Sequence, residues 1–139
     1  MHYHLLCNTE SPSLGEGSFY LNYEAIGTTV SDTGGGLFHN ATIRILGANK
    51  IEKGIYKDER GWGVWNLQNG DKVFITYTFA GEMKPSGVGF ARGTTTMTGG
   101  TGKAAGIQGS AELTRTSVRS GIDGVGLSYT KQKIKYTLP

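Results

Sequence analysis

The chain has 139 residues, of which 23 are glycine and 3 are proline, and it contains seven Tyr, five Phe and two Trp. This length suits one domain, the aromatic content excludes a disordered segment, and the lack of a Gly-X-Y period excludes collagen. The formal net charge of +3 comes without a basic block, which excludes the surface that nucleic-acid binding needs.

The first residues predict neither a leader nor a metal site. Cys7 is the single cysteine, so no disulfide forms within the chain. No stretch approaches the roughly 18 apolar residues of a membrane span, and the start has no basic leader with an apolar core. We therefore expect no transmembrane segment and no signal peptide, and the compartment stays open.

His2 and His4 have the spacing of two metal ligands on one side of a strand, but we interpret them as solvated and expect no metal.

Alternation of apolar and polar residues predicts β-strands along the whole chain. Apolar residues occupy every second position in residues 19–25, 41–45 and 72–80. Residues 61–67 predict a strand of mixed faces, and the threonine-rich residues 89–98 have the β-branched composition that strands favour. No window of eleven residues has a convincing helical period.

The segments between these strands have the composition of turns. Residues 68–71 read Gln-Asn-Gly-Asp, and Asn-Gly tolerates the positive φ values of a type I′ turn, so we predict a hairpin there. Asp58-Glu59-Arg60 reads as a charged turn before the next strand. Among the later basic residues, Arg115 and the alternating Lys131, Lys133 and Lys135 indicate solvated faces.

Roughly eight to nine strands without a helical crossover favour antiparallel pairing of neighbours. A sandwich and a closed barrel both satisfy this spacing, but glycines inside strand-like runs, such as Gly63 and Gly93, favour a curled barrel. We therefore expect residues 1–139 to form a single all-β domain, an eight-stranded (8–9) antiparallel β-barrel. A barrel of about eight strands is filled by side chains or holds one small ligand.

One glycine-rich segment resembles the signature of a known superfamily. Residues 97–109 read MTGGTGKAAGIQG, and they follow an aromatic strand at residues 73–79. This segment is similar to a turn shared by allene oxide cyclases and dirigent proteins. The resemblance covers about residues 70–114 and implies a compact, bacterial-type member of that superfamily. It implies a calycin-like, allene oxide cyclase-like barrel with an apolar cavity, often trimeric in those families.

The activities of these families follow from the resemblance. Allene oxide cyclases steer the ring closure of an unsaturated epoxide, and dirigent proteins orient phenolic radicals. Residues 8–12 resemble the Asn and Ser-Pro stretch of the cyclases, whereas Leu6 stands where the cyclases have a glutamate two residues before the Asn. The resemblance thus implies the fold and leaves the reaction open.

The strand pattern also predicts which side chains line the interior. Eight of them are expected to point inward and to form an apolar pocket for a hydrophobic or aromatic molecule: Phe19, Leu21, Tyr23, Ile43, Trp62, Ile75, Tyr77 and Phe79. Polar residues near these strands that would orient a ligand are Glu24, His39, Asn40, Glu82 and Arg92, of which the ionisable four are catalytic candidates.

Three functions are compatible with these patterns. We expect the barrel cavity to bind a small hydrophobic or aromatic molecule without a cofactor. The first alternative is a cofactor-independent cyclase or isomerase, in which the cavity restricts the conformers of an unsaturated substrate. The second alternative is a structural module with a filled barrel, whose outer face forms a homo-oligomer, either a dimer or a trimer.

Overall fold

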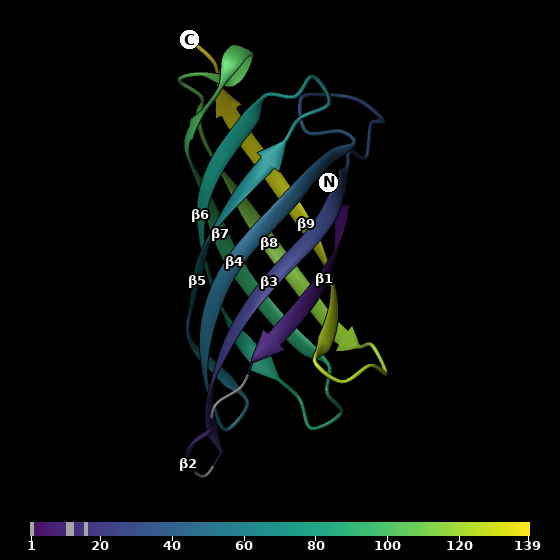
Figure 1. The fold of residues 1–139 in the computed structure, drawn as a ribbon, viewed down its shortest axis with the longest axis vertical. Helices are drawn as coiled ribbons and strands as arrows, with labels where there is room; N and C mark the ends of the chain where they lie inside the picture. The colour runs from purple at the N-terminus through teal and green to yellow at the C-terminus, as the bar shows by residue number, and fades with distance from the viewer. Residues whose placement is uncertain (1, 11–12, 16) are drawn as a thin grey trace.

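A nine-stranded antiparallel sheet makes up most of the protein (Figure 1). The computed structural model describes residues 2–10, 13–15 and 17–139, with side chains from residue 17 onward. Its strands are β1 (His2–Glu10), β2 (Ser13–Gly15), β3 (Ser18–Val30), β4 (Ala41–Glu52), β5 (Ile55–Asn66), β6 (Lys72–Met83), β7 (Gly89–Gly100), β8 (Gln108–Arg119) and β9 (Val125–Thr137). A short 3-10 helix, η1 (Gly102–Ala104), joins β7 to β8. In the part of the chain described, no helix has the length and apolar character needed to cross a membrane.

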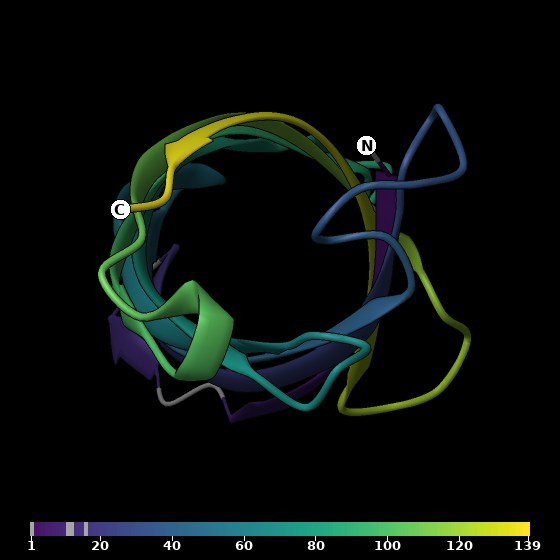
Figure 2. The same cartoon turned by 90° about the horizontal axis from the view of Figure 1, so that it is seen from above.

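The sheet curls around a central axis, as the view from above shows (Figure 2). Its strand order is β1-β9-β8-β7-β6-β5-β4-β3-β2, so from β3 to β9 each strand pairs with its neighbour in sequence. β1 pairs antiparallel with β9 and also with β3. The predicted all-β, antiparallel and barrel-like fold is confirmed, and the five predicted strands all overlap β3 to β7.

Side chains alternate between an inner face, toward the axis, and an outer face, toward solvent. Odd-numbered residues face inward over most of β3 to β8, whereas even-numbered residues face inward on β9. The outer lysines Lys131, Lys133 and Lys135 are exposed as predicted. The alternation therefore sorts the strand residues into a buried interior and a solvated surface.

The interior is packed tightly at the upper end in Figure 1. There the ring of Phe38, from the β3–β4 loop, lies 4.6 Å from the ring of Trp65. The Trp65 indole N–H donates a hydrogen bond of 3.0 Å to Thr29 Oγ1. Ile107, which follows η1, is buried at the same end. This packing leaves the lower end of the curled sheet as the place for a cavity.

Two hairpin turns differ from each other in conformation. The hairpin predicted at residues 68–71 is present between β5 and β6, but the prediction of a type I′ turn is wrong. Gly70 has a φ of 89°, whereas Asn69 is not in the positive-φ region. The Asn69 carboxamide instead accepts a hydrogen bond from the Asp71 backbone N–H at 2.9 Å. Between β4 and β5, Lys53 and Gly54 both have positive φ, as a two-residue type I′ turn requires.

Candidate functional site

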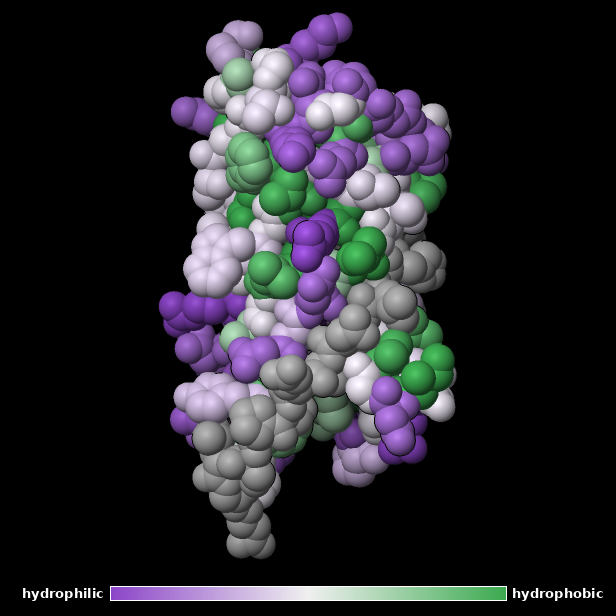
Figure 3. Space-filling model, viewed as in Figure 1, coloured by the Kyte–Doolittle hydropathy of each residue, from purple (hydrophilic) through white to green (hydrophobic). Residues whose placement is uncertain are grey.

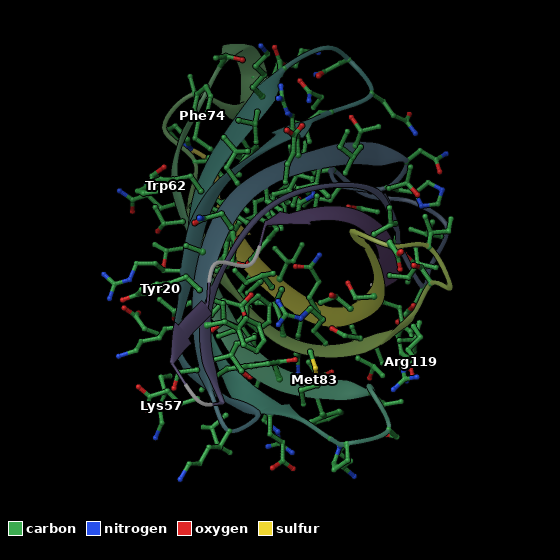
Figure 4. All side chains as sticks on the ribbon, turned by 60° about the horizontal axis from the view of Figure 1, so that its bottom comes forward. Tyr20, Lys57, Trp62, Phe74, Met83 and Arg119 are labelled. Carbon is green, nitrogen blue, oxygen red and sulfur yellow. The ribbon has the colours of Figure 1, made fainter. Side chains whose placement is uncertain are left out.

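A cavity of about 300 Å³ lies at the lower end of the curled sheet. Figure 4 brings this end forward and shows Met83 beside the opening, with Arg119 farther out. The walls come from the lower ends of β3, β4, β5, β6, β8 and β9 and from the loops next to them. Most of the wall is apolar, with Phe19, Leu21, Ile45, Ile51, Val118, Val125 and Leu127 among its lining residues.

A charged side chain enters this interior from β5. The pairing of β5 with β6 shifts register between Tyr56 and Glu59, and both side chains are buried. Glu59 continues the inward positions of Gly61 and Gly63, and the shift lets Tyr56 face inward as well. The prediction of a charged turn at residues 58–60 is therefore wrong, because these residues lie within β5 and Glu59 is 2% exposed.

Glu59 forms a buried ion pair with Arg115 on β8. Arg115 Nη1 donates to Glu59 Oε2 at 2.6 Å, and Arg115 Nη2 donates to Oε1 at 2.7 Å. The guanidinium carbon lies 4.3 Å from the centre of the Phe79 ring, within reach of a cation–π interaction. Burial lowers the pKa of Arg115, but the hydrogen bonds and charge of Glu59 outweigh it and hold that pKa above its ordinary value. The predicted solvated position of Arg115 is wrong, since it is 9% exposed.

Two further side chains complete the hydrogen bonding of this carboxylate. The Tyr23 hydroxyl donates to Glu59 Oε2 at 2.6 Å and lies 2.7 Å from the Tyr77 hydroxyl. Asn49 Nδ2 donates to Glu59 Oε1 at 3.3 Å. Burial, and then the charge of Glu59, raises the pKa of Tyr23 far above its ordinary value, so its hydroxyl stays protonated in alkaline solution where an ordinary tyrosine ionises.

The tyrosine pair fits because a glycine faces it. A Cβ at Gly47, on β4, would lie 2.6 Å from the Tyr23 hydroxyl oxygen and would also collide with the Tyr77 hydroxyl. Any larger residue at this position would displace the two rings. Gly47 therefore makes room for the hydrogen-bonded cluster of Tyr23, Tyr77, Asn49, Glu59 and Arg115, which we call the inner polar cluster.

Several buried polar atoms in this cluster and next to it have no hydrogen-bond partner in the described part of the chain. Asn49 Oδ1, Arg115 Nε and Ser128 Oγ belong to residues that line the cavity. Thr130 Oγ1 and both amide atoms of Gln132 lie farther along the inner face of β9. Unpaired buried polar atoms are costly, so a hydrogen-bond partner supplied by a ligand would stabilise those that belong to cavity residues.

The structure divides the eight predicted pocket residues into three groups. Phe19, Leu21 and Tyr23 line the 300 Å³ cavity. Farther inside, four are buried around a void of only about 10 Å³, where they form packed core: Ile43, Ile75, Tyr77 and Phe79. Trp62 is a correction, because it is 67% exposed and points away from the sheet in Figure 4. The inward positions of β5 next to it are Gly61 and Gly63, so residue 62 faces outward.

The four catalytic candidates are not among the described residues that line the cavity. Glu24 accepts a hydrogen bond of 2.8 Å from Arg44 on the outer face. Glu82 and Arg92 are exposed, as is Asn40, which lies in the β3–β4 connection. His39 lies in the same connection, and its Nδ1 accepts a hydrogen bond from the Ser31 backbone N–H at 3.1 Å. His2 and His4 lie in β1, whose side chains are outside the described part of the structure.

Alternation carried further along the strands would have found the missed residues. Trp65, Gly63 and Gly61 are inward positions, and the same period leads back to Glu59. On β8, the inward residues Ala111 and Leu113 lead to Arg115. Opposite charges at inward positions of two strands were thus a visible signal for a buried ion pair.

The outer face carries apolar side chains of its own. Figure 3 shows hydrophobic side chains between polar ones on the side that β3 and β4 cross. Ile26 and Leu46 are exposed there, and Leu46 pairs across the strands with Trp62 on β5.

Comparisons with known proteins found no match to this chain. No family model matches the chain, and no curated protein or solved structure matches it significantly.

Proposed function

We propose that the protein binds a small hydrophobic or aromatic molecule in the cavity at the lower end of the sheet. The observation that carries this proposal is the volume of about 300 Å³ enclosed by mostly apolar walls. An apolar cavity of roughly 150 Å³ holds benzene, so this one has room for a molecule of about two fused rings. Apolar walls with a few placed polar groups are typical of small-molecule sites. The same volume weighs against a structural module with a filled interior.

The proposal includes a fold assignment. We infer an eight-stranded closed barrel of the calycin, allene oxide cyclase-like type, in which β2 is an appendage to β3. The pairing of β1 with both β9 and β3 supports closure. The segment that resembles the superfamily signature, residues 97–109, comprises the end of β7, η1 and the start of β8 at the upper end in Figure 1, away from the cavity.

A cofactor-independent cyclase or isomerase is the second candidate. The inner polar cluster favours it, because Tyr23 and Glu59 are ionisable groups that line the cavity. The Tyr23 hydroxyl donates its one proton to Glu59 Oε2, and a rotation of this O–H toward the cavity would let it donate instead to a substrate oxygen on which negative charge develops. The cavity walls would restrict the substrate's conformers. If Tyr23→Phe still binds a substrate but converts it more slowly than the wild type does, that result would support this candidate over simple binding.

Calorimetric titration with naphthalene tests the binding proposal. The expected result is saturable binding to the wild-type chain and its loss in Leu21→Trp, because the larger side chain fills the cavity. Trp62→Ala is the matched control, since it removes an aromatic side chain from the outer face and should leave the affinity unchanged. Native mass spectrometry of the purified protein reports any molecule carried from the cell. No heat of binding with naphthalene, or equal binding by Leu21→Trp, would contradict the proposal.

A further inference from the structure

The charges at the cavity limit the kind of ligand it accepts. Among the described residues that line it, the charged ones are Glu59 and Arg115, which neutralise each other. Both terminal guanidinium nitrogens of Arg115 already donate to Glu59. Among these residues, an anionic ligand would find no cation that lacks a counter-charge and would meet the carboxylate of Glu59, while a cationic ligand would find that carboxylate occupied. Either charge would lose its water without compensation.

The carboxylate of Glu59 has little capacity left for a ligand. Oε1 accepts hydrogen bonds from Asn49 Nδ2 and Arg115 Nη2, and Oε2 accepts from the Tyr23 hydroxyl and Arg115 Nη1. The side chain is 1% exposed. A ligand must therefore interact with the atoms around this carboxylate instead of the carboxylate itself.

Those surrounding atoms include one donor, one acceptor and one hydroxyl. Arg115 Nε is a donor and Asn49 Oδ1 is an acceptor, and both side chains meet at Glu59 Oε1. Ser128 Oγ both donates and accepts, and Ser128 pairs with Ser117, two residues from Arg115 along β8. All three residues are at least nine-tenths buried and line the cavity. A hydrocarbon would leave these atoms unpaired, whereas a ligand hydroxyl can both donate to the acceptor and accept from the donor.

We propose that the cavity selects a neutral, apolar molecule that carries a hydroxyl group at its inner end, such as a phenol or an alcohol, and discriminates against the carboxylate of the same shape. This inference rests on the proposed binding function and specifies its ligand class. The hydroxyl contacts Asn49, Arg115 and Ser128, while the hydrocarbon part occupies the apolar wall around Phe19 and Leu21.

Three probes of one shape test this selectivity by calorimetric titration at pH 7: 2-naphthol, naphthalene and 2-naphthoate. We expect 2-naphthol to bind about tenfold more tightly than either other probe, the effect of roughly one well-made hydrogen bond or one uncompensated charge. Ser128→Ala should reduce the advantage of 2-naphthol over naphthalene severalfold. Equal affinity for the three probes, or tighter binding of 2-naphthoate, would overturn the inference and leave the binding function standing. Binding of none of the three would overturn the binding function itself.

A charge variant provides an independent test. Glu59→Gln keeps the shape of the side chain but leaves the guanidinium of Arg115 without its counter-charge. The affinity for 2-naphthoate, expressed relative to that of the same variant for naphthalene, should then rise about tenfold. Trp62→Ala is the control that should alter neither affinity. An unchanged relative affinity of a folded Glu59→Gln for 2-naphthoate would contradict the inference, and if this variant does not fold, the wild-type comparison of the three probes decides.

Discussion

Arg115 on β8 donates two hydrogen bonds, of 2.6 and 2.7 Å, to the carboxylate of Glu59 on β5, which lies 56 residues earlier in the chain. β6 and β7 separate these two strands in the sheet order. The pair is therefore not a contact between neighbouring strands, because it crosses the interior and joins two walls of the curled sheet. No other charged side chain lines the cavity in the part of the chain whose side chains are described, so each charge depends on its partner.

Removal of one partner should destabilise the fold strongly. Arg115→Met leaves the carboxylate of Glu59 buried without its counter-charge, and we expect the free energy of unfolding to fall by about 3–5 kcal/mol. Urea denaturation at neutral pH measures this change. A decrease below about 1 kcal/mol would show that Glu59 is not held as a buried anion.

Two companion variants separate the charge effect from packing. The double variant Glu59→Leu with Arg115→Met should recover most of the loss, since it removes both charges together. Arg44→Met breaks the ion pair between Arg44 and Glu24, which is 2.8 Å long but exposed on the outer face. Its expected cost is at most about 1 kcal/mol.

Stability should fall in alkaline solution because of Tyr23. Its pKa is raised in the folded protein, by burial first and then by the charge of Glu59. Above pH of about 10, tyrosine in the unfolded chain loses its proton while Tyr23 in the folded protein keeps it. The unfolded state then binds fewer protons, so the free energy of unfolding falls as the pH rises, by about 1.4 kcal/mol per pH unit for one such group.

Urea denaturation at several alkaline pH values, compared with Tyr23→Phe, measures this contribution. In the variant, the free energy of unfolding should fall less steeply with pH, by about 1.4 kcal/mol per pH unit, because one such group is gone. The variant should also be less stable than the wild type at neutral pH, because it lacks the hydroxyl that donates to Glu59. Titration of tyrosine absorbance in concentrated urea serves as the control, where the two chains should differ by one tyrosine with an ordinary pKa. Identical slopes for the two folded proteins would refute the prediction.

The strands were predictable because a one-sided sheet imposes a period of two on its sequence. Ile75, Tyr77 and Phe79 carry that period through β6, and the hairpin between β5 and β6 follows from the turn sequence between them. The conformation of that turn was not predictable in the same way. Asn69 has a side chain that can accept from the backbone, and this alternative replaced the positive φ expected from the Asn-Gly pair.

The two charged members of the inner polar cluster were missed because charge was taken to indicate exposure. Glu59 stands between two charged neighbours that are exposed, Asp58 and Arg60, and only its position in the alternation with Gly61 and Gly63 distinguishes its orientation from theirs. Trp62 was misplaced for the opposite reason, since a large aromatic side chain was taken to indicate burial. Burial on a strand depends on position within the alternation, which residue type alone does not reveal.

Gly47 should tolerate no side chain. In Gly47→Ala, the methyl group meets the hydroxyl groups of Tyr23 and Tyr77, and relief requires a shift of rings that are hydrogen bonded to each other. We expect a loss of about 1–3 kcal/mol in the free energy of unfolding. Gly99→Ala is the matched control in another strand, because the nearest atom to its methyl group is Phe74 Cδ2 at 4.0 Å. Equal effects of the two substitutions would contradict the assignment of Gly47 to the tyrosine pair.

Gln132 on β9 presents the opposite case, a buried polar side chain whose removal should stabilise the protein. It is 7% exposed, and neither its Oε1 nor its Nε2 has a hydrogen-bond partner in the described part of the chain. Gln132→Met keeps the length of the side chain and removes both unpaired atoms, so we expect the free energy of unfolding to rise by about 1–2 kcal/mol. Lys133→Met, an exposed neighbour on the same strand, should change it by less than about 0.5 kcal/mol. A loss of stability in Gln132→Met would indicate instead that the amide is hydrogen bonded to a water molecule in the void of about 10 Å³ that Gln132 lines together with Arg115 and Thr95.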